Sequence, residues 1–309
     1  MFPIIPANSV TADYPKNDEG IFGFGRPNGA SSDITNLVSN VGVVASDVTG
    51  VGTARKGVAA CEFGEDKGIF GFGANTLSMT NLVSNSGVLA SDTTGVAGVT
   101  GRSLLAACGY GVDKGIFGFG NDGDVTDVTN LVSNAGVVAT DTTGVGTART
   151  NPAACEYGEG KGIFGFGSVV TGGDERTSIT NLVSNTGVVA SDTAGIGQIR
   201  WGLSACEFGE DKGIFAYGQG PDVSPTYTGA INLVSNTGVV ASDTSGVGSV
   251  HGVNFAGCEY GQDKGIFGFG YTGLPMLDFT NLITNLGVVA SDVTTVGTPR
   301  NGLGACSFN

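Results

Sequence analysis

The amino-acid sequence predicts an all-β protein: a six-bladed β-propeller of four-stranded antiparallel blades, closed by pairing the C-terminal strand with the N-terminal blade. Three observations support this fold class. One motif recurs six times with a period of 47 to 52 residues, which is typical of repeat arrays and propellers. No segment shows helical periodicity with caps. The first copy begins at its second strand and the last ends after its first, so the two orphan strands can pair and remove free sheet edges.

Three markers define each copy. The first is Gly-Ile-Phe-Gly-Phe-Gly, which begins at Gly20, Gly68, Gly115, Gly162 and Gly265, with a variant at Gly213. The second is Thr-Asn-Leu-Val-Ser-Asn or a close variant, which begins at Thr35, Thr80, Thr129, Thr180, Ile231 and Thr280. The third is one cysteine per copy: Cys61, Cys108, Cys155, Cys206, Cys258 and Cys306. A linear solenoid would need atypical polar repeats at its ends, and here the end copies resemble the middle ones.

Each copy predicts four short strands joined by tight turns. In the fifth copy, strands are expected at 203–208, 213–217, 232–235 and 239–242, with Gly- and Asn-rich hairpin turns at 209–212 and 236–238. In the first copy, Phe22 and Phe24 alternate with Gly23, so we expect both rings on one face of their strand. Strands without a polar face indicate sheets buried on both sides, with the phenylalanines of one packed on the glycines of the next.

Composition excludes several classes of function. Only 14% of the 309 residues are charged and the net charge is −14, which disfavours nucleic acid and anionic membrane surfaces as partners. The N-terminus lacks the basic and apolar regions of a secretory signal, and no apolar run is long enough to span a membrane. We therefore expect synthesis and folding in a cytoplasm. Equivalent cysteines on neighbouring sheets are about 10 Å apart, too far for a disulfide, so buried free thiols are expected.

The sequence predicts no catalytic site, metal or cofactor. The single histidine, His251, stands where other copies carry an arginine, and we expect it to replace that arginine in a structural contact. One histidine cannot supply a copper site or most histidine-based triads. The aspartates that end the fourth strands (Asp47, Asp92, Asp141, Asp192, Asp243 and Asp292) suit local Asx turns, with calcium ligation as the alternative. The acidic loop 121–127 is expected to be a solvated loop, with calcium ligation as the alternative. The ring of cysteine thiols is expected to fill space between strands rather than bind a metal.

Variation between copies concentrates in the loops between the second and third strands: 26–34, 74–79, 121–128, 168–179, 219–230 and 271–279. In a meander these loops lie on the same face as the crossings between copies. Loops on a rigid scaffold are common recognition sites. The candidate binding residues on this face are Trp201, Arg176, Tyr227 and Tyr271; unconstrained drift of the loops is the alternative.

The order of parts resembles a kelch repeat. An arginine (Arg55, Arg102, Arg149, Arg200, Arg300) precedes each apolar first strand except where His251 replaces it, and the Gly-Phe-Gly ending resembles the kelch double glycine. The tyrosine, aspartate and proline of the kelch third strand and the tryptophan of its fourth are absent. The resemblance covers residues 18–309. The repeat sequence from Thr-Asn-Leu-Val-Ser-Asn to the arginine before the next first strand is also similar to kelch-like repeats of tailed-bacteriophage virion and tail proteins.

That second resemblance implies a non-enzymatic virion component on the capsid or tail that contacts other virion proteins, with residues 1–17 as a docking arm and 18–309 as the propeller. The expected location is the virion. The alternative is a carbohydrate-binding propeller that contacts a host surface, glycan or protein, through its variable loops. An enzyme is disfavoured because the near six-fold symmetry leaves no convergent acid–base groups.

Overall fold

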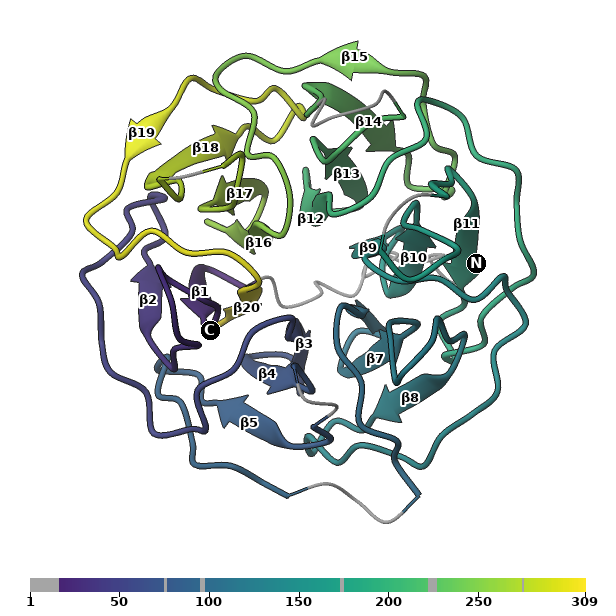
Figure 1. Cartoon of the computed structure of the whole chain (residues 1–309), viewed down its shortest axis with the longest axis horizontal. Coiled ribbons are helices and arrows are strands. Elements are labelled where there is room, and N and C mark those ends of the chain that lie inside the picture. The colour runs from purple at the N-terminus through teal and green to yellow at the C-terminus, as the bar shows by residue number, and fades with distance from the viewer. Residues whose placement is uncertain (1–16, 75–76, 95–97, 173–174, 222–226, 274) are drawn as a thin grey trace, which may run out of the picture.

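The structure is a computed structural model, and it describes residues 17–74, 77–94, 98–172, 175–221, 227–273 and 275–309. Apart from Asn17, the predicted N-terminal arm lies outside the described residues. Within these ranges the chain forms strands and no helix, and the strands make six small antiparallel sheets. Figure 1 shows the sheets arranged around a central axis. The predicted all-β repeat fold with a propeller-like arrangement is confirmed at this level, and we call the sheets blades 1 to 6.

The blades are built in the same order along the chain. Blade 1 comprises β20 (Gly304–Phe308), β1 (Glu19–Gly23) and β2 (Thr35–Val38). Blade 2 comprises β3 (Ala59–Phe63), β4 (Lys67–Gly71) and β5 (Thr80–Val83). Blade 3 comprises β6 (Ala106–Tyr110), β7 (Lys114–Gly118) and β8 (Thr129–Val132). Blade 4 comprises β9 (Ala153–Tyr157), β10 (Lys161–Gly165) and β11 (Thr180–Val183). Blade 5 comprises β12 (Ser204–Phe208), β13 (Lys212–Ala216), β14 (Ala230–Val234) and β15 (Thr244–Ser245). Blade 6 comprises β16 (Ala256–Tyr260), β17 (Lys264–Gly268), β18 (Phe279–Ile283) and β19 (Val293–Thr294).

The C-terminal strand β20 pairs with β1, as the sequence predicts. Ile21 lies opposite Cys306 and Phe22 opposite Ala305. The backbone N–H of Asp18 donates to the carbonyl of Asn309 at 2.9 Å, so the chain ends replace the hairpin turn that joins the first two strands of the other blades. Each innermost strand also contacts the next one around the axis, from β3 through β6, β9, β12 and β16 to β20 and back to β3.

The prediction of four strands in every blade is wrong, because within the described ranges a fourth strand forms in blades 5 and 6 alone. In blade 1 the outermost segment makes two isolated bridges, Thr35 with Val48 and Val38 with Val44, whose registers differ by one residue. Between them the Asn36 side chain donates to the carbonyl of Ala45 at 3.0 Å. A side chain thus takes the place of ladder bonds, and the extra residue forms a bulge that interrupts the strand.

Neighbouring blades pack through glycine and phenylalanine, as predicted. A Cβ atom on Gly23 of blade 1 would lie 2.8 Å from the Phe70 ring of blade 2, so this position needs a residue without a side chain. The expected common face of Phe22 and Phe24 is wrong. Phe24 has a φ of 63°, which ends the strand and turns its ring toward Phe70 of blade 2, while Phe22 packs on Phe269 of blade 6. Each copy therefore uses one ring for each of its two neighbours.

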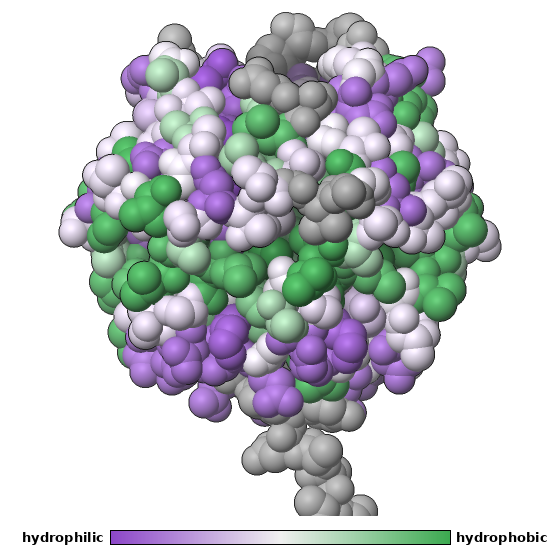
Figure 2. Space-filling view, turned by 90° about the horizontal axis from the view of Figure 1, so that it is seen from below, coloured by the Kyte–Doolittle hydropathy of each residue, from purple (hydrophilic) through white to green (hydrophobic). Residues whose placement is uncertain are grey.

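The outer rim of the ring is apolar. Figure 2 shows a hydrophobic band around the middle of the visible side, between more hydrophilic layers above and below it. One valine directly after each Asn-x-Gly turn is more than half exposed: Val43, Val88, Val137, Val188, Val239 and Val288. The Asp-Lys hairpin turns form part of one end face, and in four of them the lysine pairs with the aspartate before it.

Candidate functional site

An arginine holds five of the six joints between blades. Arg55 is 1% exposed and stacks its guanidinium 4.0 Å from the centre of the Phe24 ring in blade 1. It donates from Nε to the carbonyl of Phe72 at 2.7 Å and from a terminal nitrogen to Oδ1 of Asn81 at 2.6 Å, both in blade 2. Burial lowers its pKa to about 10, so the guanidinium keeps its charge at neutral pH. The cation–π contact and the bonds together link one blade to the next.

The equivalent arginines stack on a phenylalanine in the same way: Arg102 on Phe72, Arg149 on Phe119, Arg200 on Phe166 and Arg300 on Phe269. Arg300 joins blade 6 to blade 1 through bonds to the carbonyl of Phe24 at 2.8 Å and to Asn36 at 2.7 Å. Blades 6 and 1 therefore meet in a joint built like that of Arg55.

The aspartates that end the fourth strands have a different role from the predicted local Asx turn. Asp92 accepts from Nδ2 of Asn81 at 2.9 Å within its own blade, and from the backbone N–H and hydroxyl of Thr53 in the crossing from the previous blade. Burial raises the pKa of Asp92, but the hydrogen bonds from Thr53 and Asn81 outweigh this effect and hold the pKa below its usual value. Each such carboxylate fastens a crossing to the next blade.

His251 replaces the arginine at the joint between blades 5 and 6, as the sequence predicts. It is fully buried, with Nδ1 2.6 Å from the carbonyl of Phe269 and Nε2 2.7 Å from Oδ1 of Asn281. Three aromatic rings surround the imidazole: Phe255 stacks on it, Phe279 lies 4.7 Å away and Tyr217 makes an edge contact at 5.1 Å. Burial lowers the pKa of His251, and a neutral imidazole can donate to only one of the two oxygens.

The six cysteines are free and buried, as predicted. A Cβ on Gly20 would lie 2.7 Å from Sγ of Cys258, so each thiol fits against a glycine of the neighbouring blade. Burial raises the pKa of all six thiols, which keeps them protonated. Their place between blades supports the packing role.

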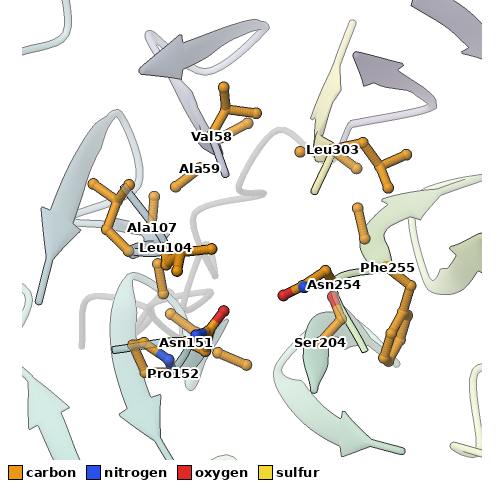
Figure 3. Close-up of a pocket in the computed structure, with 18 of the residues that line it drawn as sticks. Val58, Ala59, Leu104, Ala107, Asn151, Pro152, Ser204, Asn254, Phe255 and Leu303 are labelled. Atoms are coloured by element: carbon orange, nitrogen blue, oxygen red, sulfur yellow. The ribbon is translucent and has the colours of Figure 1, made fainter. Parts of the chain in front are cut away.

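A circle of six backbone hydrogen bonds surrounds the axis at the variable-loop end. We call it the collar; its members, which donate in turn to one another, are Gly57, Leu104, Asn151, Gly202, Asn254 and Gly302. All six have φ between 51° and 67°, in the left-handed region. The collar borders a cavity of about 100 Å³ on the axis, around which Figure 3 shows Asn151, Asn254 and Leu104. The sequence does not predict the collar, because its six equivalent positions hold three residue types, Gly, Asn and Leu, and so show no repeated motif.

A second cavity of about 40 Å³ lies further along the axis, lined by the cysteines and by Glu62, Glu156, Glu207 and Glu259. Gly109 replaces the glutamate in blade 3, and a Cβ there would lie 2.2 Å from a carboxylate oxygen of Glu156. Within the described ranges no group of three histidine, cysteine, aspartate or glutamate side chains could hold a metal ion. In the acidic loop 121–127, Asn121 and Asp124 form hydrogen bonds inside the loop.

The four predicted binding residues lie on the collar side of blades 4, 5 and 6. Trp201 directly precedes Gly202 of the collar and exchanges backbone bonds with Gln219, and Gln219 in turn bridges to Tyr227. Burial, and then the charge of Tyr271, raise the pKa of Tyr227. Tyr271 itself bridges to Gly252 and Val253 in blade 6.

Arg176 belongs to blade 4, where it bridges to Ser168. The structure thus links Trp201 to Tyr227 through Gln219, and places Tyr271 in the next blade and Arg176 in the blade before.

The comparisons with known proteins support the fold and no family. No protein-family model and no curated protein matches the chain. A solved structure with a similar fold is that of a fungal alcohol oxidase of the AA5 family in complex with copper. It is 12% identical with a TM-score of 0.54, and the match covers 85% of this chain and 70% of that one. At this identity the likeness shows the fold alone.

This comparison contradicts the predicted bacteriophage virion component, because the similar structure is that of a fungal enzyme, and neither a family model nor a curated protein links the chain to a phage particle. None of the described segments forms a helix that could span a bilayer.

Proposed function

We propose that this chain is a non-catalytic recognition module that binds a polypeptide on the collar side of blades 4 to 6, through Trp201, Tyr227, Tyr271 and Arg176. We infer that its frame is a six-bladed propeller closed by β1 and β20. The observation that carries the proposal is the position of Trp201: a partly exposed indole directly beside the collar, with Tyr227 joined to it through Gln219.

The collar provides a rigid base for this surface. Its six bonds run from blade to blade, and Trp201 is fixed between the buried Arg200 on one side and Gly202 on the other. A side chain held by such a frame loses little conformational entropy on binding, which favours affinity.

The residue types favour a polypeptide partner. Tryptophan, tyrosine and arginine are the residues that most often dominate the binding energy of protein interfaces. A net charge of −14 disfavours polyanions on the same surface.

Selection of a yeast-displayed random peptide library against the whole protein tests the proposal. The repeats supply replacements that the fold already accepts: Trp201→Ser, because Ser103 holds the equivalent bridge to Asn121, and Tyr227→Val, because Val125 holds the equivalent bridge in blade 3. We expect enriched peptides to bind the wild type at least about tenfold more tightly than either variant. A selection without enriched peptides, or peptides that bind all three proteins equally, would refute the proposal.

A matched control keeps the test specific. Val125→Tyr introduces the same ring on blade 3, away from Trp201, and should not create or remove binding. Far-UV circular dichroism of each variant confirms that the blades remain folded, so that lost binding reports on the surface.

A further inference from the structure

The apolar rim is unequal around the ring, and the difference lies on blades 6 and 1. Each blade presents four outer positions: the residue inside the Asn-x-Gly turn, the residue after it, the residue after the fourth-strand aspartate, and a residue of the following crossing. In blades 1 and 6 all four are apolar and 50% to 77% exposed: Val41, Val43, Val48 and Val51; Leu286, Val288, Val293 and Val296.

Blades 2 to 5 differ at two of these four positions. The turn position holds Ser86, Ala135, Thr186 or Thr237, and the position after the aspartate holds Thr93, Thr142, Thr193 or Thr244. The repeat itself therefore shows that the fold requires no apolar residue there. Exposing an apolar side chain to water is unfavourable. The fold therefore does not explain the apolar residues at these positions in blades 1 and 6, which are Val41, Val48, Leu286 and Val293.

The joint between blades 6 and 1 lies between the two sets of residues. Thr298, two residues after Val296, donates its backbone N–H to Asp47 at 3.0 Å, and Val48 follows that aspartate. At the turn, a Cβ on Gly42 would lie 2.9 Å from Leu282 of blade 6, so Val41 and Val43 flank a contact between the blades. Figure 1 shows β19 beside blade 1 on the outer edge of the ring.

We propose that this rim sector is a self-association surface through which a second copy of the chain packs in a two-fold, isologous dimer. The eight side chains expose roughly 700 Å² of apolar surface, close to the ~800 Å² that each partner of a standard interface buries.

Charge favours a second copy over a charged partner. None of the eight residues is charged, and the nearby carboxylate of Asp47 already accepts from Thr298 and Asn36. Two copies of net charge −14 repel at long range, so an uncharged apolar contact is the kind of surface by which they can associate.

Sedimentation velocity over a concentration series of the full chain tests the dimer. The test variant is Val41→Ser, Val48→Thr, Leu286→Thr and Val293→Thr, which copies the residues of blades 2 and 4. The matched control is Val137→Thr with Val188→Thr on blades 3 and 4. We expect the wild type and the control to dimerise, and the dissociation constant of the test variant to rise by at least about tenfold, since four apolar contacts per copy are lost.

Three results would overturn the proposal: a wild type that stays monomeric at the highest concentration, a test variant that dimerises like the wild type, and a control that weakens the dimer equally. A second measurement does not depend on the fourfold variant. Because the native thiols are buried, a spin label reacts selectively at Val48→Cys, and pulsed electron paramagnetic resonance then detects the label on the partner copy. A short inter-label distance at position 48, and none for Val137→Cys, supports the dimer; the reverse contradicts it.

Discussion

The joint between blades 5 and 6 differs from the five arginine joints in how it is filled. At the Arg55 and Arg300 joints one guanidinium covers a phenylalanine ring and donates to two oxygens of the next blade, a carbonyl and an asparagine Oδ1. Arg149 and Arg200 donate to the asparagine of the next blade, and Arg102 donates to the carbonyl of Phe119. At the sixth joint the smaller His251 leaves space that Tyr217, Phe255 and Phe279 occupy. Aromatic packing can fill the lost volume, but it cannot supply the missing donor. We therefore infer that this joint is weaker than the joints of Arg55 and Arg300, where both oxygens receive a donor.

The largest effect is expected from removing an arginine. Arg300→Met leaves the carbonyl of Phe24 and Oδ1 of Asn36 buried without their donor and removes the cation–π contact with Phe269. The loss should be about 3–5 kcal/mol in the free energy of unfolding, typical of a buried charged partner. Urea denaturation measures it. A loss under about 1 kcal/mol would show that the arginine joints are not the main clamps.

Arg300→Lys is the control for charge. Lysine keeps the charge but lacks the planar fork that reaches both acceptors, so most of the loss should remain.

Converting the sixth joint into an arginine joint sharpens the comparison. His251→Arg alone should lower the free energy of unfolding by about 1–3 kcal/mol, because the aromatic rings already fill the space. Adding Tyr217→Phe and Phe279→Ile introduces residues found at arginine joints. These two changes should raise the free energy of unfolding back to the wild-type value or above it. Thermal and urea unfolding of both variants check this. A destabilised triple variant would show that the joint has diverged beyond these three residues.

A smaller effect is expected on lowering the pH. Burial lowers the pKa of His251 below its ordinary 6.5, so the unfolded chain binds this proton more tightly than the folded one. Stability is complete above pH 6.5 and should fall below it, by about 1.4 kcal/mol for each unit by which the pKa is lowered. Urea unfolding at pH 7.5, 6.0 and 5.0 measures the decline.

His251→Gln is the comparison protein and should lack this step. The aspartates with lowered pKa, such as Asp47 and Asp92, lose their contribution only below about pH 4, so the two effects separate. Equal pH profiles for both proteins would contradict the assignment.

The smallest effect concerns the collar, which all six joints share. Leu104 adopts a φ of 55°, where a branched side chain is strained, whereas Asn151 and Asn254 hold equivalent positions. Leu104→Asn should raise the free energy of unfolding by up to about 1 kcal/mol. Thermal unfolding detects the shift; a destabilised variant would show that packing of the Leu104 side chain outweighs the backbone strain.

The sequence predicts the repeat architecture well because spacing alone carries it. Six copies, the buried phenylalanines and cysteines, and the pairing of β1 with β20 follow from the repeat and its phase. The reversed direction of Phe24 was missed, because a residue in the left-handed region breaks the alternation that strand periodicity assumes. The interrupted fourth strand was missed for a related reason: Asn36 satisfies backbone groups with its side chain.

The candidate site is harder to predict than the fold. Trp201 and Tyr227 stand out as unusual residues in variable loops, yet their link through Gln219 depends on a bridge that no motif encodes. The role of Asp92 was misread because its partner Thr53 lies 39 residues earlier, in another blade. Contacts between copies have no local sequence signal, and these contacts build the joints and the collar.

Hydrogen exchange of the native protein tests the weakness of the sixth joint most directly. The collar bond from Asn254 to Gly202 and the turn bond from Gly209 to Asp263 both cross it, and the equivalent bonds from Gly302 to Asn254 and from Gly261 to Asp18 cross the Arg300 joint. We predict faster exchange of the Asn254 and Gly209 amides than of Gly302 and Gly261. Equal or slower exchange would contradict the claim that the histidine joint is weaker than the Arg300 joint.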